Sequence, residues 1–164
     1  MSIILGLNCN HADSSACIFK DGKLLFAIEE ERINRIKHWA GLPLNSINEC
    51  LEYTNIDVNE ITDISINTNP LSNLNQKIFF FLKSYIFGKK KYEIFKRLKK
   101  KVNIKNDINK NLKQGKLNDN VKLHYIDHHL SHIASAFYPS KFNDAVGLSI
   151  DGFGDFCSLM IADC

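Results

Sequence analysis

The chain reads Ile3-Ile4-Leu5-Gly6-Leu7-Asn8 near its N-terminus and Ala145-Val146-Gly147-Leu148-Ser149-Ile150 near its C-terminus. Each run is apolar enough to form a buried β-strand. Each is followed by a polar turn and then by a second apolar run, at residues 16–19 in the first case and 156–162 in the second. A strand, a polar turn and a strand that occur twice predict a fold of two similar halves, whose polar turns face a shared cleft.

The segment between these runs alternates between strand and helix patterns. Asp21-Gly22 predicts a type I′ hairpin turn, because both residues tolerate positive φ. A later helix is expected to begin with Asn45 or Ser46 as its N-cap. The expected elements are strands 3–7, 16–19, 24–28, 61–66 and 121–126, and helices at 29–39, at 46–54, within 73–116 and after Asp127.

This order, β-β-β-α-β-α-β-α, is typical of a ribonuclease-H-like subdomain, and its restart near residue 145 is typical of the actin/hexokinase-like fold. We therefore predict an α/β chain with a ribonuclease-H-like, actin-hexokinase-like (ASKHA) mixed sheet and flanking helices. Residues 1–143 would form the first subdomain, with a helical excursion at about 70–120. Residues 144–164 would form the opening hairpin of a second subdomain, so we expect the second half to be truncated.

Bulk composition indicates a globular protein of one domain. The chain has 164 residues, of which 45% are hydrophobic and 24% charged. Its five cysteines, an odd number without a C-x-x-C pair, indicate a reducing compartment. No signal-peptide pattern opens the chain, and its most apolar run, residues 78–82, is far shorter than the roughly 20 residues that span a bilayer. We expect a cytoplasmic protein without a membrane partner.

A basic segment runs from Lys89 to Lys116. It holds twelve Lys or Arg residues against two acids, in a chain whose net charge is only +3. Such a segment can attract RNA or anionic lipid. The alternative is a solvated helical face in a Lys- and Asn-rich sequence. We favour the solvated face and expect no nucleic-acid partner.

Three of the six histidines lie within Asp127-His128-His129-Leu130-Ser131-His132, directly after a strand pattern. Residues four apart on a helix share a face, so His128 and His132 should project side by side while His129 points elsewhere. Two imidazoles at this spacing can hold one divalent metal ion. The alternative is that both histidines only cover the start of a helix.

Several motifs together resemble the NodU/CmcH-type O-carbamoyltransferases in order and spacing. The resemblance covers most of the chain outside the variable region 68–120. The motifs are the loop at residues 8–16, the turn at 20–23, the charged string at 29–43, the histidine run at 127–137 and the Ile150-Asp151-Gly152-x-Gly154-Asp155 turn.

The resemblance implies an ATP-dependent enzyme that transfers a carbamoyl group to a hydroxyl. In that family a separate YrdC-like domain makes carbamoyl-adenylate from carbamoyl phosphate and ATP. An N-terminal domain, similar to the TsaD-type tRNA threonylcarbamoyl transferases, then passes the carbamoyl group on. The implied acceptor is a small molecule of natural-product biosynthesis.

The resemblance also implies roles for individual residues. The implied metal ligands, for iron or zinc, are His128, His132 and Asp151. The implied catalytic residues are His129, which would support the ligands or transfer a proton, and His11 and Asp13, which would line the same cleft.

Residues of two loops are candidates for binding an anionic substrate. Ser14 and Ser15 can bind phosphate through hydroxyls and backbone amides, with ordinary turn chemistry as the alternative. For Arg35, Lys37 and His38, the alternative is an exposed helix with pairs such as Glu31–Arg35.

Family members are several times longer than this chain. We therefore expect an N-terminal part of a larger protein or a truncated reading frame, without the YrdC-like domain, that does not by itself form product from ATP and carbamoyl phosphate. The alternatives are a tRNA threonylcarbamoyl transferase-like or sugar-kinase-like protein, or a non-catalytic truncated binding module. An exposed sheet edge also favours a homo-oligomer.

Overall fold

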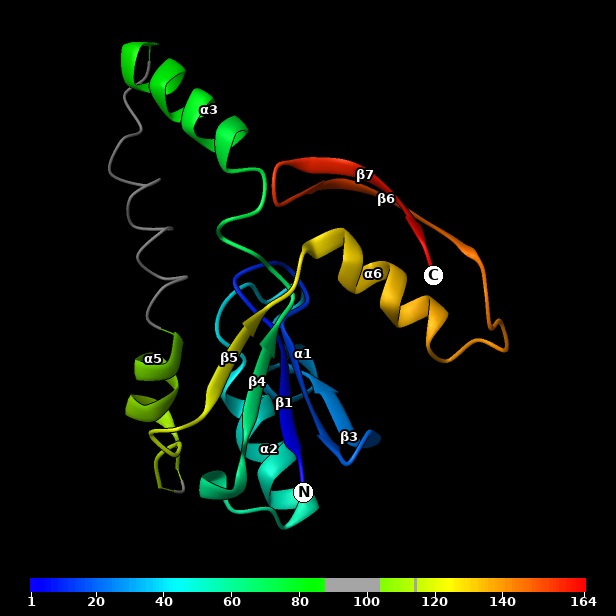
Figure 1. The fold of residues 1–164 in the computed structure, drawn as a ribbon. Helices are drawn as coiled ribbons and strands as arrows, with labels where there is room; N and C mark the ends of the chain where they lie inside the picture. The colour runs from blue at the N-terminus through cyan, green and yellow to red at the C-terminus, as the bar shows by residue number, and fades with distance from the viewer. Residues whose placement is uncertain (88–103, 114) are drawn as a thin grey trace. The chain divides into compact units, whose positions relative to one another are not determined.

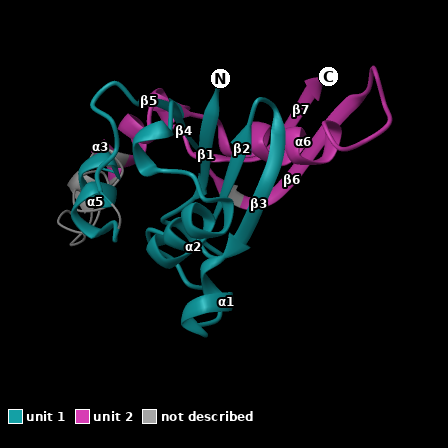
Figure 2. Ribbon diagram, turned by 90° about the horizontal axis from the view of Figure 1, so that it is seen from below, with its two compact units in different colours: residues 1–66, 100–124 teal, residues 67–99, 125–164 magenta. Residues whose placement is uncertain are grey.

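The computed structural model describes residues 1–87, 104–113 and 115–164 (Figure 1). The chain divides into two compact units, which Figure 2 colours separately. Unit 1 comprises Met1–Ile66 and Lys100–His124, and unit 2 comprises Asn67–Lys99 and Tyr125–Cys164. The boundary predicted between residues 143 and 144 stays a prediction. No helix within the described ranges is long and apolar enough to cross a membrane.

A five-stranded mixed sheet forms the centre of unit 1, in the order β3-β2-β1-β4-β5. Strand β2 is antiparallel to both β1 and β3, whereas β4 is parallel to β1. Figure 1 shows β4 and β5 pointing the same way. The mixed α/β arrangement that the sequence predicts is therefore present. The strand bounds are β1 Ile3–Asn8, β2 Ser15–Lys20, β3 Lys23–Glu29, β4 Asp63–Ile66 and β5 Lys122–Tyr125.

The alternation of buried and half-exposed residues along β1 matches the period of a strand with one buried face. Asp21 and Gly22, between β2 and β3, have φ values of 49° and 79°, so the predicted turn with two positive dihedrals is confirmed. Helix α2 (Leu44–Thr54) packs its apolar side on β2 and β3. The core of the unit includes Ile3, Leu5, Ile18, Ile47, Leu51, Ile64 and Ile66.

Helix α1 spans only Glu30–Asn34, so the helix predicted over residues 29–39 ends early. Arg35 has a left-handed φ of 61°, and the Asn34 side chain accepts a hydrogen bond from the N–H of Ile36 at 2.8 Å. A local bond of this kind competes with helix formation. The expected pair of Glu31 with Arg35 is consequently absent from the described contacts.

The N-terminus of α2 is held by Glu30, a buried carboxylate from α1. The N-cap residue is Pro43, so the prediction of Asn45 or Ser46 was wrong. Glu30 accepts hydrogen bonds from the N–H and side chain of Asn45, at 3.3 and 2.7 Å, and from the N–H and hydroxyl of Ser46, both at 2.8 Å. These two side chains face Glu30 because its charge satisfies the helix end better than a neutral cap.

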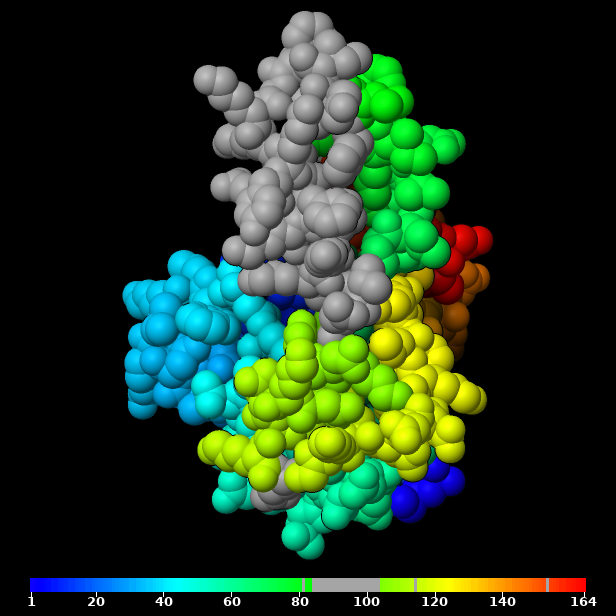
Figure 3. All heavy atoms as spheres, turned by 90° about the vertical axis from the view of Figure 1, so that its left-hand side faces the viewer, coloured from blue at the N-terminus to red at the C-terminus, as the bar shows by residue number. Residues whose placement is uncertain are grey.

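Two helices occupy the described part of the predicted excursion, α3 (Leu74–Phe87) and α5 (Ile104–Asn111). The 3₁₀ helix η1 (Val58–Glu60) precedes β4. Ile104 and Ile108 of α5 are buried in unit 1, and Figure 3 shows the segment around α5 in yellow-green against cyan-green residues of the same unit. Residues 88–103 lie outside the described residues, and with them most of the basic segment.

Unit 2 contains helix α6 (His128–Phe137) and an antiparallel hairpin of β6 (Val146–Gly154) and β7 (Cys157–Asp163). The hairpin turn is Asp155-Phe156, where both residues have positive φ. The turn predicted at residues 151–155 is therefore placed too early, because β6 continues past Asp151. The strand pairing is irregular between Ile150 and Gly154.

Candidate functional site

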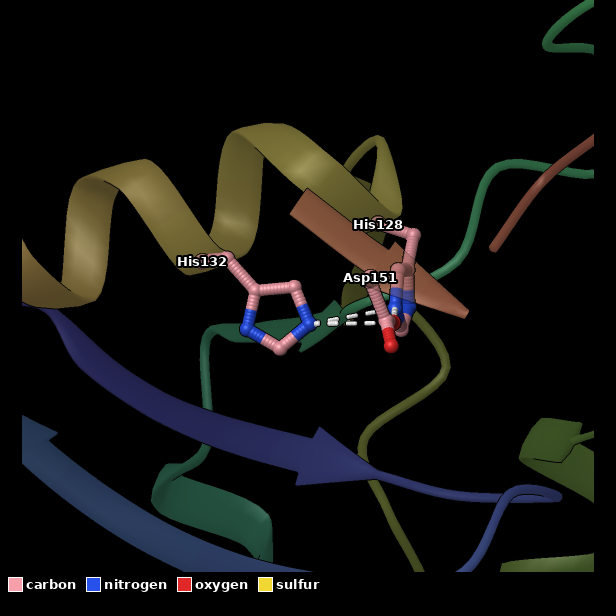
Figure 4. A group of neighbouring side chains, drawn as sticks. All are labelled: His128, His132 and Asp151. Atoms are coloured by element: carbon pink, nitrogen blue, oxygen red, sulfur yellow. Dashed lines mark hydrogen bonds and ion pairs between the residues drawn. The ribbon is translucent and has the colours of Figure 1, made fainter. Parts of the chain in front are cut away.

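Three polar side chains from α6 and β6 converge in unit 2 (Figure 4). His128 is the first residue of α6, and its side chain is only 9% exposed. His132 lies one turn later at 53%, and Asp151 of β6 at 40%. The predicted placement of the two histidines side by side is confirmed, whereas their role as metal ligands stays a prediction.

The converging atoms lie at hydrogen-bond distances or slightly beyond. His128 Nε2 is 2.7 Å from Asp151 Oδ2 and 3.1 Å from His132 Nε2. His132 Nε2 is 3.6 Å from the same carboxylate oxygen. The Nε2 atoms of His128 and His132 and the Oδ2 atom of Asp151 thus lie close to one another and face the same small region.

The electrostatics of Asp151 favour its charged form. The hydrogen bond from His128 lowers the pKa of the Asp151 carboxyl, a bond from the Gly152 N–H lowers it further, and the charges of His128 and His132 act in the same direction. An ionised carboxylate is the form that binds a cation.

The donor set fits one divalent metal ion. At metal–ligand distances of 2.0–2.2 Å, ligand atoms around a tetrahedral ion stand about 3.4 Å apart. The three observed separations of 2.7, 3.1 and 3.6 Å bracket that value. Three protein ligands with open positions also match the donor count of catalytic rather than structural zinc sites.

A glycine backbone lies directly against the His128 ring. A Cβ atom built on Gly154 would overlap the His128 imidazole, whereas a Cβ on Gly152 would meet nothing within 4 Å. The end of β6 therefore needs a residue without a side chain at Gly154, so that the ring of His128 can occupy its observed position.

His129 points away from the other two histidines and into the hairpin. Its Nδ1 is 2.8 Å from the Ser149 hydroxyl, and its Nε2 is 3.0 Å from the Cys157 carbonyl oxygen. The carbonyl can only accept, so Nε2 carries the proton and Nδ1 accepts from Ser149. His129 thus ties α6 to both strands of the hairpin, and the proton-transfer role predicted for it stays a prediction.

Asp155 is a residue of this region that the sequence analysis did not assign to the site. Its carboxylate accepts hydrogen bonds from the Thr68 hydroxyl and the Asn69 N–H, both at 2.7 Å, and from the N–H of His128 at 3.2 Å. An Asp that follows a glycine is typical of an ordinary turn, and the sequence carries no signal of its partners far along the chain.

The second group of predicted residues lies in unit 1, on the loops that follow β1 and α1. Ser14 is buried and joins the two loops. Its hydroxyl is 2.9 Å from the Gly41 carbonyl and 3.1 Å from the Gly41 N–H, and its own N–H donates to the Trp39 carbonyl. Ser14 therefore fixes the loop geometry, and the phosphate-binding role predicted for Ser14 and Ser15 stays a prediction.

Asp13 and His38 meet on the surface of these loops. Their side chains are 2.9 Å apart, the His38 ring is 76% exposed, and the Glu31 carboxylate lies close by. The hydrogen bond and the charge of Asp13, with a smaller effect of Glu31, raise the pKa of His38 above its ordinary value. Arg35 and Lys37 are exposed on the same loop.

His11 is half-buried in the first of these loops. All of these residues belong to unit 1, whereas His128, His129, His132 and Asp151 belong to unit 2. The cleft that the two groups were predicted to share stays a prediction.

Comparison with known protein families matches residues 3–162 to the family described as Carbamoyltransferase N-terminus. The nodulation protein NolNO of Sinorhizobium fredii is 34% identical over 151 residues, which are 92% of this chain and 21% of that protein. The uncharacterized protein sll1178 of Synechocystis is 33% identical over 163 residues, which are 96% of this chain and 26% of that protein. The chain spans about a quarter of the length of these curated relatives.

Among solved structures, YeaZ from Pseudomonas aeruginosa matches with a TM-score of 0.45 and 11% identity, over 99% of this chain and 64% of that chain. A likeness of this strength carries no argument about fold or function.

Proposed function

The chain belongs to the Carbamoyltransferase N-terminus family, and from this we propose that it supplies the carbamoyl-transfer site of an ATP-dependent O-carbamoyltransferase. The proposed donor is carbamoyl-adenylate, made from carbamoyl phosphate and ATP, and the proposed acceptor is a hydroxyl of a small molecule in natural-product biosynthesis. The step that makes the donor is proposed for a YrdC-like domain and for neither unit of this chain.

The proposed fold of such an enzyme part is ribonuclease-H-like within the ASKHA class. Support comes from the strand order β3-β2-β1-β4-β5, in which three antiparallel strands are followed by a parallel one. The second strand–turn–strand, β6 and β7, supports the proposed repetition of that opening pattern.

The observation that carries the proposal is the convergence of His128, His132 and Asp151 within the region that the family matches. We propose that these residues hold iron or zinc. A divalent ion bound there would polarise the carbamoyl carbonyl and orient the adenylate phosphate. The chain's own contribution is to hold two imidazoles and an ionised carboxylate at one point.

In the proposed transfer, the acceptor oxygen bonds to the carbamoyl carbon and the bond from that carbon to the phosphate oxygen of AMP breaks, so AMP leaves. The O–H bond of the acceptor hydroxyl also breaks, and its proton passes to the solvent. Catalytic roles are proposed for His11 and Asp13, and substrate binding for Arg35, Lys37 and His38. The substrate-binding role of Arg35, Lys37 and His38 is supported by the exposure of their side chains to solvent. Ser14 is left out of this proposal because its N–H and hydroxyl are already engaged.

The test supplies the donor ready-made. Zn²⁺-loaded chain is mixed with carbamoyl-adenylate carrying an isotope label at the carbonyl carbon and with a panel of sugars that offer free hydroxyls. We expect a labelled carbamate ester and AMP, detected by mass spectrometry, and no ester when ATP and carbamoyl phosphate replace the adenylate.

Two variants on α6 make the result specific. His132→Ala removes a candidate ligand, so we expect it to abolish both Zn²⁺ binding and ester formation. Leu130→Ala changes an exposed residue of the same helix and should retain both. Ester formation that survives His132→Ala, or its absence in the unaltered chain, would refute the proposal.

A further inference from the structure

We propose that Asp155 is a positioning residue for the His128–His132–Asp151 site, and that it acts through the backbone of His128. The inference rests on the proposed function, because it presupposes that the three side chains hold a metal ion. Asp155 is not itself one of the converging groups.

The contacts of Asp155 fix the first residue of α6. Its carboxylate accepts the His128 N–H at 3.2 Å, at the helix end where backbone N–H groups lack intrahelical partners. The N-cap residue, Asp127, makes no side-chain capping bond in the described structure. The carboxylate that binds a backbone N–H at the positive end of α6 is therefore that of Asp155, from the hairpin turn.

The same carboxylate is anchored on its other side. The hydroxyl of Thr68, which is fully buried, donates to it at 2.7 Å, and the N–H of Asn69 donates at 2.7 Å. The Asn73 side chain also donates to the backbone carbonyl of Asp155 at 2.8 Å. Asp155 thus joins the chain that precedes α3 to the first turn of α6.

Two consecutive residues at the end of the hairpin hold His128 from different directions. The backbone of Gly154 lies against the imidazole, and the carboxylate of Asp155 binds the main chain. A metal site tolerates displacements of only about 0.5 Å in its ligands. Since His128 is the most buried of the three candidate ligands, a shift of its backbone carries the ring directly out of register with Asp151.

The test compares Zn²⁺ affinity, measured by competition with a chromophoric chelator, in the full 164-residue chain and in two variants. Asp155→Ala removes both carboxylate oxygens, so the N–H groups of Asn69 and His128 both lose their acceptor. We expect its Zn²⁺ affinity to fall about 10–100-fold, the range found for residues that orient metal ligands.

Thr68→Val is the matched control. It removes a buried bond to the same carboxylate and should lower the unfolding temperature, but it leaves the contact with His128 in place. We expect its Zn²⁺ affinity to stay within about threefold of the unaltered chain, because ligand geometry rather than general stability sets metal affinity. Equal losses of affinity in both variants would indicate a merely structural role and overturn the inference.

The remaining outcomes separate the inference from the function on which it rests. An unaltered chain that binds no Zn²⁺ refutes the proposed metal site itself. A chain that binds Zn²⁺ equally well with and without Asp155→Ala refutes only the inference. If Asp155→Ala shows no cooperative unfolding transition, Asp155→Glu takes its place. It retains the charge but moves it by one methylene, and we expect at least a threefold loss; unchanged affinity would overturn the inference.

Discussion

Two helices of this chain, α2 in unit 1 and α6 in unit 2, are closed at their N-termini by an acidic side chain from elsewhere. At α2, Glu30 accepts four hydrogen bonds from the N–H groups and side chains of Asn45 and Ser46. At α6, Asp155 accepts the N–H of His128 and is anchored by two further donors. Neither N-cap residue, Pro43 or Asp127, provides a capping side chain in the described structure.

The two contacts differ in what they hold in place. Glu30 is 2% exposed, and the residues that it binds lie beside Ile47 and Cys50 in the core. Asp155 is half-buried, and one residue that it binds is a candidate metal ligand. The same electrostatic device thus supports the core in one unit and the site in the other. A mutation of Glu30 should therefore lower the stability of the fold, whereas a mutation of Asp155 should lower the affinity for the metal ion.

The largest effect is expected at Glu30. Glu30→Gln replaces one acceptor oxygen with a donor, which must then face the backbone N–H of either Asn45 or Ser46. Because the site is buried, we expect a loss of about 3 kcal/mol in the free energy of unfolding, measured in urea. Under conditions where the variant is folded, its Zn²⁺ affinity should match that of the unaltered chain. Glu29→Gln is the control, because Glu29 is partly exposed and its pair with Arg32 contributes at most about 1 kcal/mol. A lower Zn²⁺ affinity in folded Glu30→Gln would erase the distinction between the two helices.

A second prediction concerns the ring of His128. Gly154→Ala places a methyl group where the imidazole lies, so we expect a loss of about 2 kcal/mol in stability and of about 10–100-fold in Zn²⁺ affinity. Calorimetric titration with Zn²⁺ measures the affinity. Gly152→Ala is the matched control two residues away, because its new methyl group meets nothing within 4 Å. Identical behaviour of the two alanine variants would show that the position of His128 does not matter for the site.

A smaller effect is expected for the bond between Ser149 and His129. Ser149→Ala leaves the buried Nδ1 of His129 without its donor, which should cost about 1 kcal/mol in stability. We expect the Zn²⁺ affinity to change less than in Gly154→Ala, because His129 holds α6 on the hairpin without touching the three converging atoms. Thermal unfolding and Zn²⁺ competition are the measurements, and Ser158→Ala, on the exposed part of β7, is the control. A larger loss of affinity than in Gly154→Ala would assign His129 a direct part in the site.

The sequence predicts what depends on local periodicity. The alternation in β1, the positive dihedrals at Asp21 and Gly22 and the spacing of His128 and His132 all follow from neighbours within a few positions, and the structure contains each of them. These patterns were sufficient to place the strands of the sheet and to bring two candidate ligands to one face of α6.

What the sequence does not show is bonding between residues far apart. Glu30 lies among charged neighbours, a pattern that predicts exposure to solvent, yet it binds Asn45 and Ser46 on the far side of the loop between α1 and α2. Asp155 reads as a turn residue, yet its partner Thr68 lies 87 positions away. The early end of α1 is an exception with a local cause, because the bond from the Ile36 N–H to the Asn34 side chain competes with helix formation.

The smallest predicted effect belongs to a third acidic contact, Asp13 with His38, which is exposed. The hydrogen bond and charge of Asp13 raise the pKa of His38 above 6.5, its ordinary value. A raised pKa in the folded state means that the protonated pair stabilises the fold fully below pH 6.5 and that this contribution is lost as the pH rises through the folded-state pKa.

We expect an NMR titration of the His38 ring to show the raised pKa, and we expect Asp13→Asn to return this pKa toward 6.5. The control is Asp144→Asn, which changes an exposed acid in unit 2 and should leave the His38 pKa unchanged. Because solvent screens this pair, stability should hardly respond to its loss, unlike the loss of Glu30. A His38 pKa that does not move in Asp13→Asn would mean that the two side chains are not paired in solution. Acidic contacts would then persist where they are buried or half-buried, as at Glu30 and Asp155, and not where they are exposed, as at Asp13.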